Sequence, residues 1–170
     1  MHKDLITLNQ ITQPIVEDMK IFQKEFENAL DSEVRLINSI SKYMIKNKGK
    51  NIRPILTIFS ARLCGEPTIN SYRAAAMMEL LHIATLIHDD VVDYSYSRRG
   101  KKSVNYLWTN GHSVLMGDFI YSKAFKLMVD LDDNKILKEL SSATNDIATG
   151  ELVQLDSFGQ LKITESELKK

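Results

Sequence analysis

The sequence has little of what marks several classes of protein. Its 170 residues include one cysteine, Cys64, which excludes an internal disulfide and is typical of a reducing compartment. Three prolines and seven glycines impose few turns, and strand-like alternation is scarce. Lysine plus arginine and aspartate plus glutamate each number 22, so the net charge is zero. That balance argues against non-specific nucleic-acid binding, and we expect no nucleic-acid partner.

Signals for membrane insertion and secretion are also lacking. No uncharged apolar run approaches the roughly 20 residues that span a bilayer. The first residues combine neither a basic segment nor a clean apolar run, as a signal peptide would. We therefore expect a cytoplasmic protein without a transmembrane segment. With 44% hydrophobic and 26% charged residues, the chain can bury one sizeable core, and we take residues 1–170 as a single domain.

What the sequence does contain is helical periodicity, which predicts an all-α fold. Residues 4–30 have amphipathic spacing with Pro14 at a start or kink, and residues 32–47 follow with Asp31 or Ser32 as N-cap. Thr68 is the expected N-cap of a long helix that ends near Asp93. The remaining helices are expected over 54–63, from about Ser103, over 111–126, over 135–155 and, from the capping-box spacing of Thr164 and Glu167, from residue 165.

The most informative stretch is LLHIATLIHDDVVDYSYSRRG, residues 80–100, in which an apolar helix leads into three aspartates. Asp89 and Asp93 lie one helical turn apart, with Asp90 beside them. Carboxylates this close repel and raise one another's pKa, and a hard cation such as Mg²⁺ relieves that repulsion. Arg98 and Arg99 follow, and guanidinium groups match phosphate oxygens. The stretch predicts a magnesium–diphosphate site.

A second basic element, KNKGKNIRP, occupies residues 46–54 before an expected helix whose first turn contains Pro54. Lys50 and Arg53 would then lie at a helix N-terminus, which favours anions. A basic loop by itself is more often only a solvated surface. A second acidic cluster occupies residues 130–133 and is followed by Asn134, which is typical of turns. We predict that this cluster is a solvated loop between helices.

Four segments together resemble the trans-isoprenyl (polyprenyl) diphosphate synthase family, over about residues 45–155. They are, in the family's order, GKNIRP at 49–54, DDVVD with RRG at 89–100, GHSVLMGDF at 111–119 and GELVQL at 150–155. The resemblance implies an antiparallel helical bundle of the isoprenoid synthase type. The family continues with a Lys-Thr motif and a second aspartate-rich motif, which this sequence lacks. We therefore expect the N-terminal half of a synthase, cut short or completed by another chain.

The resemblance also implies the chemistry. Family members condense isopentenyl diphosphate with an allylic diphosphate by Mg²⁺-assisted ionisation, condensation and elimination, and a homodimer is expected. Asp89, Asp90 and Asp93 would be catalytic, with Asp89 and Asp93 as metal ligands. The other site residues expected from the family are Arg98, Asp90 and Gln154 for the allylic diphosphate, and Lys50, Arg53, His82 and Arg99 for isopentenyl diphosphate.

Product length is expected to depend on the helix before the aspartates. Family members that make short products carry a bulky aromatic residue five positions before the motif, where this chain has Ala84. The small side chains predict a tunnel, open for more than a helical turn of about 5 Å, and hence a medium or long all-trans polyprenyl diphosphate. The expected tunnel residues are Ala84, Thr85, Leu81 and Met78.

Departures from the family pattern are few. Lys48 stands where the family has the first glycine of its basic element, and residues 101–103 replace x-P-T after RRG. We expect His88 to be structural, Gly117 to permit close helix packing and Asp118 to be buried or partnered.

Two alternatives remain. A non-catalytic subunit of a two-chain synthase would be expected to have a damaged first motif, which is intact here. A terpene cyclase would have no second diphosphate to bind, so it would not need Lys50, Arg53 and His82. A lone histidine on an apolar helix is otherwise more often a core residue than a ligand.

Overall fold

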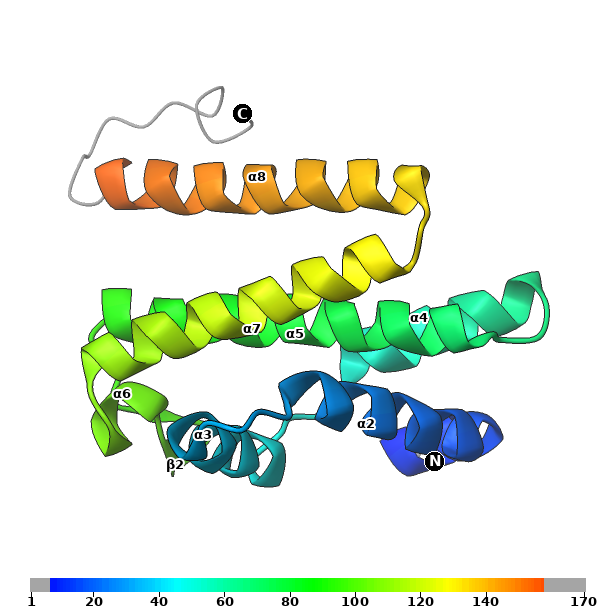
Figure 1. Ribbon diagram of the computed structural model, residues 1–170, viewed down its shortest axis with the longest axis horizontal. Helices are drawn as coiled ribbons and strands as arrows, with labels where there is room; N and C mark the ends of the chain where they lie inside the picture. Colours follow the sequence, from blue (N-terminus) through cyan, green and yellow to red (C-terminus); the bar gives the residue numbers. More distant parts are fainter. Residues whose placement is uncertain (1–6, 158–170) are drawn as a thin grey trace, which may run out of the picture. The chain divides into compact units, whose positions relative to one another are not determined.

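The structure is a computed structural model that describes residues 7–157 (Figure 1). The chain divides into two compact units, Met1–Asp132 and Asp133–Lys170. Helices make up nearly all of the regular structure in the described residues, and the all-α prediction is confirmed. None of these helices is both long and apolar enough to cross a membrane.

The N-terminal segment is helical but interrupted. It consists of α1 (Leu8–Thr12), the 3₁₀ turn η1 (Gln13–Ile15) and α2 (Val16–Leu30). The Thr7 side chain caps α1 by accepting from the backbone N–H of Gln10. Pro14 lies in the 3₁₀ turn, as the predicted kink requires, because proline has no N–H for a continuous α-helix.

The next helix begins later than the sequence suggested. Helix α3 spans Arg35–Lys46 with Val34 as its N-cap, so the prediction of Asp31 or Ser32 as N-cap is wrong. The Ser32 N–H donates to Asn38 Oδ1 at 3.2 Å, and Ser32 Oγ accepts from the Val34 N–H at 3.2 Å. These two bonds fix residues 32–34 in a turn that precedes the helix.

Helix α5 (Ile69–Val92) is the centre of the first unit. It packs against α2, α4 (Ile52–Cys64) and α7 (Asn110–Asp130), and α7 runs beside it in Figure 1. Thr68 caps α5 in a capping box with Ser71, and Asp93 is the C-cap, as predicted. Its core positions Leu80 and Ala84 have no exposed surface. The long apolar helix is therefore buried on most sides, which explains its weak amphipathic pattern.

A buried polar network joins α2, α4 and α5. The Asp18 carboxylate of α2 accepts from Arg62 Nε of α4 at 2.7 Å and from the Tyr72 hydroxyl of α5 at 2.7 Å. Asp18 is 3% exposed. The hydrogen bond from Arg62, aided by the one from Tyr72, lowers the pKa of Asp18 despite its burial. This network fixes three helices at one point of the core.

A short hairpin follows α5. Strands β1 (Ser97–Arg98) and β2 (Lys101–Lys102) pair antiparallel, and α6 (Val104–Leu107) follows with Ser103 as N-cap. The two turn residues, Arg99 and Gly100, have φ of 53° and 73°. Positive φ at both central positions is the type I′ geometry that matches the strand twist. The helix expected from about Ser103 is thus only one turn long before α7.

The second unit contains one described helix, α8 (Asn134–Ser157), where a helix over 135–155 was predicted. Asp133 Oδ1 accepts from the backbone N–H groups of Lys135 and Ile136 at 2.8 and 3.2 Å. Residues 130–133 thus lie at the turn between α7 and α8, and Asp133 caps α8. The helix predicted at Thr164–Glu167 lies outside the described residues.

Candidate functional site

A cavity of about 130 Å³ lies in the first unit, where three segments distant in sequence meet. These segments are the end of α3 with the loop 47–49 that follows it, the second half of α5, and the β1–β2 hairpin. The polar and charged residues that line it are Tyr43, Asn47, Lys48, Glu79, His82, Asp90, Arg98, Arg99, Lys101, Lys102 and Ser103. Five of these side chains are cationic and two are acidic, so the cavity favours an anion.

Arg99 reaches this cavity through a close backbone approach. A Cβ atom added to Gly49 would lie 1.6 Å from Arg99 Nη1, so the guanidinium lies directly against Gly49. Arg99 itself adopts a left-handed conformation, which is uncommon for residues other than glycine, asparagine and aspartate. The GKNIRP and RRG segments, separated by most of α4 and α5, are therefore in contact.

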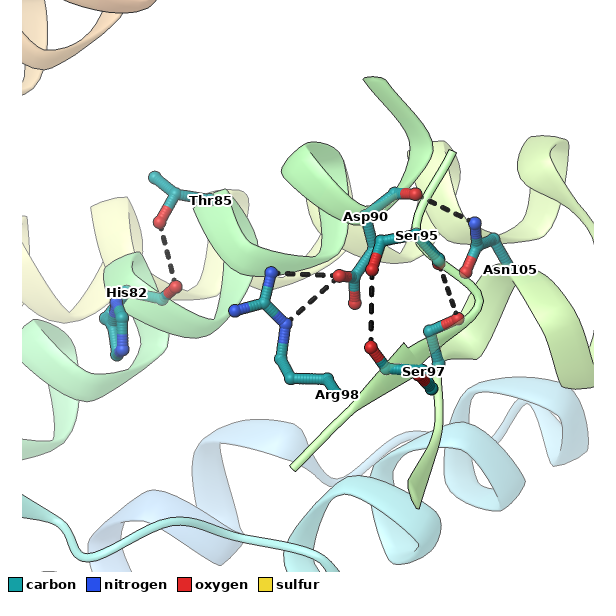
Figure 2. A network of polar contacts seen from close by, with 8 residues as sticks. His82, Thr85, Asp90, Ser95, Ser97, Arg98 and Asn105 are labelled. Atoms are coloured by element: carbon teal, nitrogen blue, oxygen red, sulfur yellow. Dashed lines mark hydrogen bonds and ion pairs between the residues drawn. The ribbon is translucent and has the colours of Figure 1, made fainter. Parts of the chain in front are cut away.

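Asp90 fastens the hairpin to the end of α5. Its Oδ1 accepts from Arg98 Nε at 3.0 Å and from Arg98 Nη2 at 2.9 Å, and its carbonyl oxygen accepts from Asn105 Nδ2 at 2.9 Å (Figure 2). The same carbonyl accepts from the Ser95 N–H at 2.9 Å. Because Asp90 is 6% exposed, its carboxylate serves to hold Arg98 in place.

His82 lines the cavity as a neutral imidazole at pH 7. Burial lowers the pKa of His82 to about 4, and the positive charges of Arg53, Arg99 and Arg98 lower it further in the same direction. Its carbonyl oxygen accepts from the Thr85 hydroxyl at 2.8 Å, one turn along α5 (Figure 2). A neutral imidazole can donate one hydrogen bond to a phosphate oxygen.

The two basic residues of the GKNIRP segment, Lys50 and Arg53, lie outside the cavity. Lys50 and Arg53 are both exposed at the start of α4, with Asn51 as its N-cap. Neither residue lines the cavity, although the positive charge of Arg53 helps to lower the pKa of His82. Lys48, the departure from the family pattern, donates from Nζ to Gln23 of α2 and so ties the loop to that helix.

Asp89 and Asp93 lie at the C-terminal end of α5. The Asp93 N–H donates to the Asp89 carbonyl at 2.8 Å, which places them one turn apart as predicted, and Asp93 is exposed. Among residues 7–157, no three histidine, cysteine or acidic side chains form a metal cage. Two carboxylates nevertheless fit Mg²⁺, which usually takes one or two carboxylates and completes its shell with water and substrate phosphate.

The expected chain-length residues lie on another side of α5. None of Met78, Leu81, Ala84 and Thr85 lines the cavity, and Ala84 is fully buried. Beside them, burial raises the pKa of Tyr121 on α7, and so does the negative charge of Asp89. The Asp89 side of α5 is therefore close to α7. Gln154 is exposed on α8, in the second unit.

The packing of α5 on α7 depends on Gly117. A Cβ there would lie 2.2 Å from His88 Nε2, so the histidine side chain fills the space that glycine leaves. His88 Nε2 also lies 3.2 Å from the Val114 carbonyl oxygen and 3.5 Å from Asp118 Oδ1. As expected, His88 has a structural contact and Gly117 permits close packing. Asp118 is partnered but exposed, rather than buried.

Sequence reasoning missed Glu79. This residue is 7% exposed and lines the cavity one turn before His82. Burial raises its pKa, while the charges of Arg53 and Arg99 act in the opposite direction. The available signal was a single acidic residue inside the apolar run AAAMMELLHIATLIH.

Known proteins resemble this chain over most of its length. The family model for polyprenyl synthetase matches residues 34–170. An all-trans-nonaprenyl-diphosphate synthase (geranyl-diphosphate specific) of Rhodobacter capsulatus is 41% identical over 156 residues, covering 91% of this chain and 48% of its own length. The octaprenyl diphosphate synthase of Escherichia coli K12 is 41% identical over 160 residues, covering 94% of this chain and 50% of its own.

Solved structures of polyprenyl synthases also resemble this chain. A polyprenyl synthase from Caulobacter crescentus CB15, complexed with calcium and isoprenyl diphosphate, superposes with a TM-score of 0.89 at 34% identity, over 97% of this chain and 50% of that one. The chain has an all-α isoprenoid synthase fold, and it belongs to the polyprenyl synthetase family. It spans about half the length of the curated relatives it matches.

Proposed function

We propose that this chain is part of a prenyltransferase that condenses isopentenyl diphosphate with an allylic diphosphate. The observation that carries the proposal is the cavity where Gly49, His82 and the Arg98–Arg99 pair come together from three separate segments. The five cationic side chains at this cavity give it a positive potential that favours an anion such as a diphosphate. The names of the two relatives described above, a nonaprenyl and an octaprenyl diphosphate synthase, support the same reaction class.

The cavity would bind the diphosphate of isopentenyl diphosphate. Arg99 and Arg53 would supply charge and Lys50 a further ammonium group from the start of α4, while neutral His82 would donate a hydrogen bond. Binding at guanidinium groups held by the fold would orient the substrate double bond without costly reorganisation.

The allylic diphosphate would bind near the end of α5. Arg98, held by Asp90, would provide a fixed guanidinium, and Gln154 is the proposed contact from α8. Asp89 and Asp93 would hold Mg²⁺, which supplies positive charge against the leaving diphosphate. We propose no protein nucleophile, because the carbon–carbon bond forms between the two substrates and the released diphosphate accepts the proton.

We further propose a medium or long all-trans product, made in the cytoplasm by a homodimer. Small residues at Ala84 and Thr85 support the product length. The oligomeric state is tested by light scattering of the purified chain, in which the mass of a monomer would contradict the dimer.

The deciding experiment incubates this 170-residue chain with Mg²⁺, farnesyl diphosphate and labelled isopentenyl diphosphate, and resolves products by length. Elongation beyond fifteen carbons supports the proposal, and omission of Mg²⁺ should abolish it. If the chain is inactive, the assay is repeated with a longer chain or an added partner chain, and restored activity would support a site completed outside these residues. Inactivity in both forms would contradict the proposal and favour the non-catalytic subunit.

A further inference from the structure

Helix α5 ends at the aspartates in a cap formed by residues 93–95, called here the α5 cap. The Ser95 N–H donates to the Asp90 carbonyl at 2.9 Å, and the Tyr94 N–H donates to the Val91 carbonyl at 3.3 Å. This pair of bonds around the C-cap residue Asp93 is the Schellman arrangement, which ends many helices. It needs a left-handed residue directly after the C-cap, and glycine usually occupies that position because it has no Cβ atom.

The left-handed residue of the α5 cap is Tyr94, with a φ of 52°. A positive φ is uncommon for residues other than glycine, asparagine and aspartate, and it is unfavourable for a bulky side chain. The Tyr94 side chain is 72% exposed, so burial in the core does not compensate for this conformation. A strained conformation persists only where the surrounding structure holds it, and the α5 cap therefore depends on contacts from elsewhere in the fold.

Asn105 of α6 supplies such a contact. Its Nδ2 donates to the Asp90 carbonyl at 2.9 Å (Figure 2). The carbonyl oxygen thus accepts two hydrogen bonds, one from Asn105 and one from the Ser95 N–H of the α5 cap. Because the Ser95 N–H already satisfies this oxygen, the bond from Asn105 serves as an additional anchor that comes from outside α5.

Asn105 is costly as a residue with a purely structural role. It is 7% exposed, and within residues 7–157 its Oδ1 has no hydrogen-bond partner. A buried amide oxygen without a donor lowers the stability of a fold. An apolar side chain of similar shape would avoid that cost, since the Asp90 carbonyl would keep its bond from Ser95. Overall stability therefore does not account for an asparagine at this position, whereas its bond to the α5 cap does.

We propose that Asn105 is a positioning residue, which anchors the strained α5 cap so that Asp89 and Asp93 keep the spacing needed to hold one magnesium ion. The Asp93 N–H donates to the Asp89 carbonyl at 2.8 Å, so this spacing depends on the last turn of α5. The inference rests on the proposed function of the two aspartates as metal ligands. Asn105 itself does not contact the substrate in this scheme.

The strain at Tyr94 gives the inference a specific consequence. Without the bond from Asn105, relaxation of Tyr94 toward a negative φ breaks the bonds of the α5 cap, and Asp93 moves relative to Asp89. A glycine at position 94 adopts the left-handed conformation without strain. The loss of Asn105 should therefore disturb the α5 cap much less when residue 94 is glycine.

The first test is hydrogen–deuterium exchange of the metal-free 170-residue chain, followed by mass spectrometry of peptides that cover residues 89–98. Asn105→Leu removes the donor but keeps a side chain branched at Cγ, and we expect the amides of residues 93–95 to exchange about fivefold faster in it. Asn70→Leu, at an exposed position at the other end of α5, is the matched control and should leave their exchange unchanged. Unchanged exchange in Asn105→Leu would overturn the inference.

A second substitution separates anchoring of the α5 cap from a general loss of stability. Adding Tyr94→Gly to Asn105→Leu should return the exchange of residues 93–95 to within about twofold of the wild-type rate. Faster exchange throughout the chain, without recovery in the double variant, would assign Asn105 a purely structural role and contradict the proposal. If circular dichroism shows that Asn105→Leu does not fold, Asn105→Ala, which adds no bulk, replaces it with the same expectations.

The second test measures the consequence for the metal site, by calorimetric titration of inorganic diphosphate with and without Mg²⁺. Mg²⁺ should strengthen binding to the wild-type chain. Asn105→Leu should weaken the Mg²⁺-dependent binding about tenfold and change the metal-free binding less than about twofold. If Mg²⁺ does not strengthen binding to the wild-type chain, the proposed metal site and this inference fail together. If Asn105→Leu retains the full effect of Mg²⁺, the inference alone is overturned.

Discussion

The guanidinium of Arg99 lies against the α-carbon of Gly49, so closely that a methyl group on Gly49 would overlap Nη1 at 1.6 Å. This contact joins the loop before α4 to the turn of the β1–β2 hairpin. The contact gives Gly49 a steric role and places the guanidinium of Arg99 at the cavity that is proposed to bind a diphosphate.

Gly49→Ala should therefore weaken diphosphate binding without unfolding the chain. The added methyl displaces the flexible end of Arg99, so we expect about tenfold weaker binding of inorganic diphosphate and less than about 1 kcal/mol of lost stability. Gly150→Ala is the matched control, because a Cβ there meets nothing within 4 Å. Unchanged affinity in Gly49→Ala would show that Arg99 is not needed in its observed position.

Substitutions of Asp90 and of Asp93 should lower the stability of the chain by different amounts. Asp90→Asn removes the ion pair with Arg98 and should destabilise the chain by about 2 kcal/mol in urea unfolding, because Asp90 is buried. Asp93→Asn, at an exposed position, should cost less than about 0.5 kcal/mol yet abolish Mg²⁺-dependent activity. Equal stability losses would contradict the structural role assigned to Asp90.

The Asp18 network should contribute a pH-dependent part of the stability. Because the folded pKa of Asp18 is lowered, its stabilisation is present above the unfolded value of about 3.9 and is lost as pH falls through the folded value. Asp18→Asn should lower the free energy of unfolding by about 1–3 kcal/mol at pH 7. In urea unfolding at a series of acidic pH values, the variant should also lose less stability as the pH falls. Glu17→Gln, its exposed neighbour paired with Lys20, should cost about 0.5 kcal/mol or less. A comparable cost in both variants would rule out the network as the cause.

His82 should lower stability in mild acid. Its folded pKa of about 4 lies below the unfolded value of about 6.5, so the unfolded chain binds more protons between these values and stability falls as pH falls through that window. The free energy of unfolding of the wild-type chain should fall between pH 7 and pH 4. In His82→Gln this fall should be smaller by on the order of 2 kcal/mol. Urea unfolding at a series of pH values measures this, and parallel curves for the two proteins would contradict it.

Ala84→Phe should shorten the product. The position is 0% exposed on α5, and the growing chain is proposed to run past it, so a phenyl ring there would narrow the proposed path. We expect shorter prenyl diphosphates in the product assay and a stability loss of about 1–3 kcal/mol from overpacking. An unchanged product distribution in a folded variant would refute the tunnel at Ala84.

The sequence by itself determined the helices and the chemistry at their ends. Apolar periodicity and caps such as Thr68 are local, so α5 and α8 could be predicted to within a few residues. The start of α3 could not be predicted in this way, because residues 32–34 are held in a turn by hydrogen bonds between the Asn38 side chain and the backbone of Ser32. Similarly, the DDVVD and RRG segments predicted a metal–diphosphate site from residue type and spacing alone.

Only the tertiary structure decided which of these residues meet. The contact of Arg99 with Gly49 and the pairing of Asp90 with Arg98 depend on how the hairpin folds back on α5, which no local pattern specifies. Glu79 is a single acidic residue in an apolar helix, and only the fold shows that it is buried at the edge of the cavity. A sequence records which side chains are available, whereas burial and the approach of charges across the fold determine what each one does.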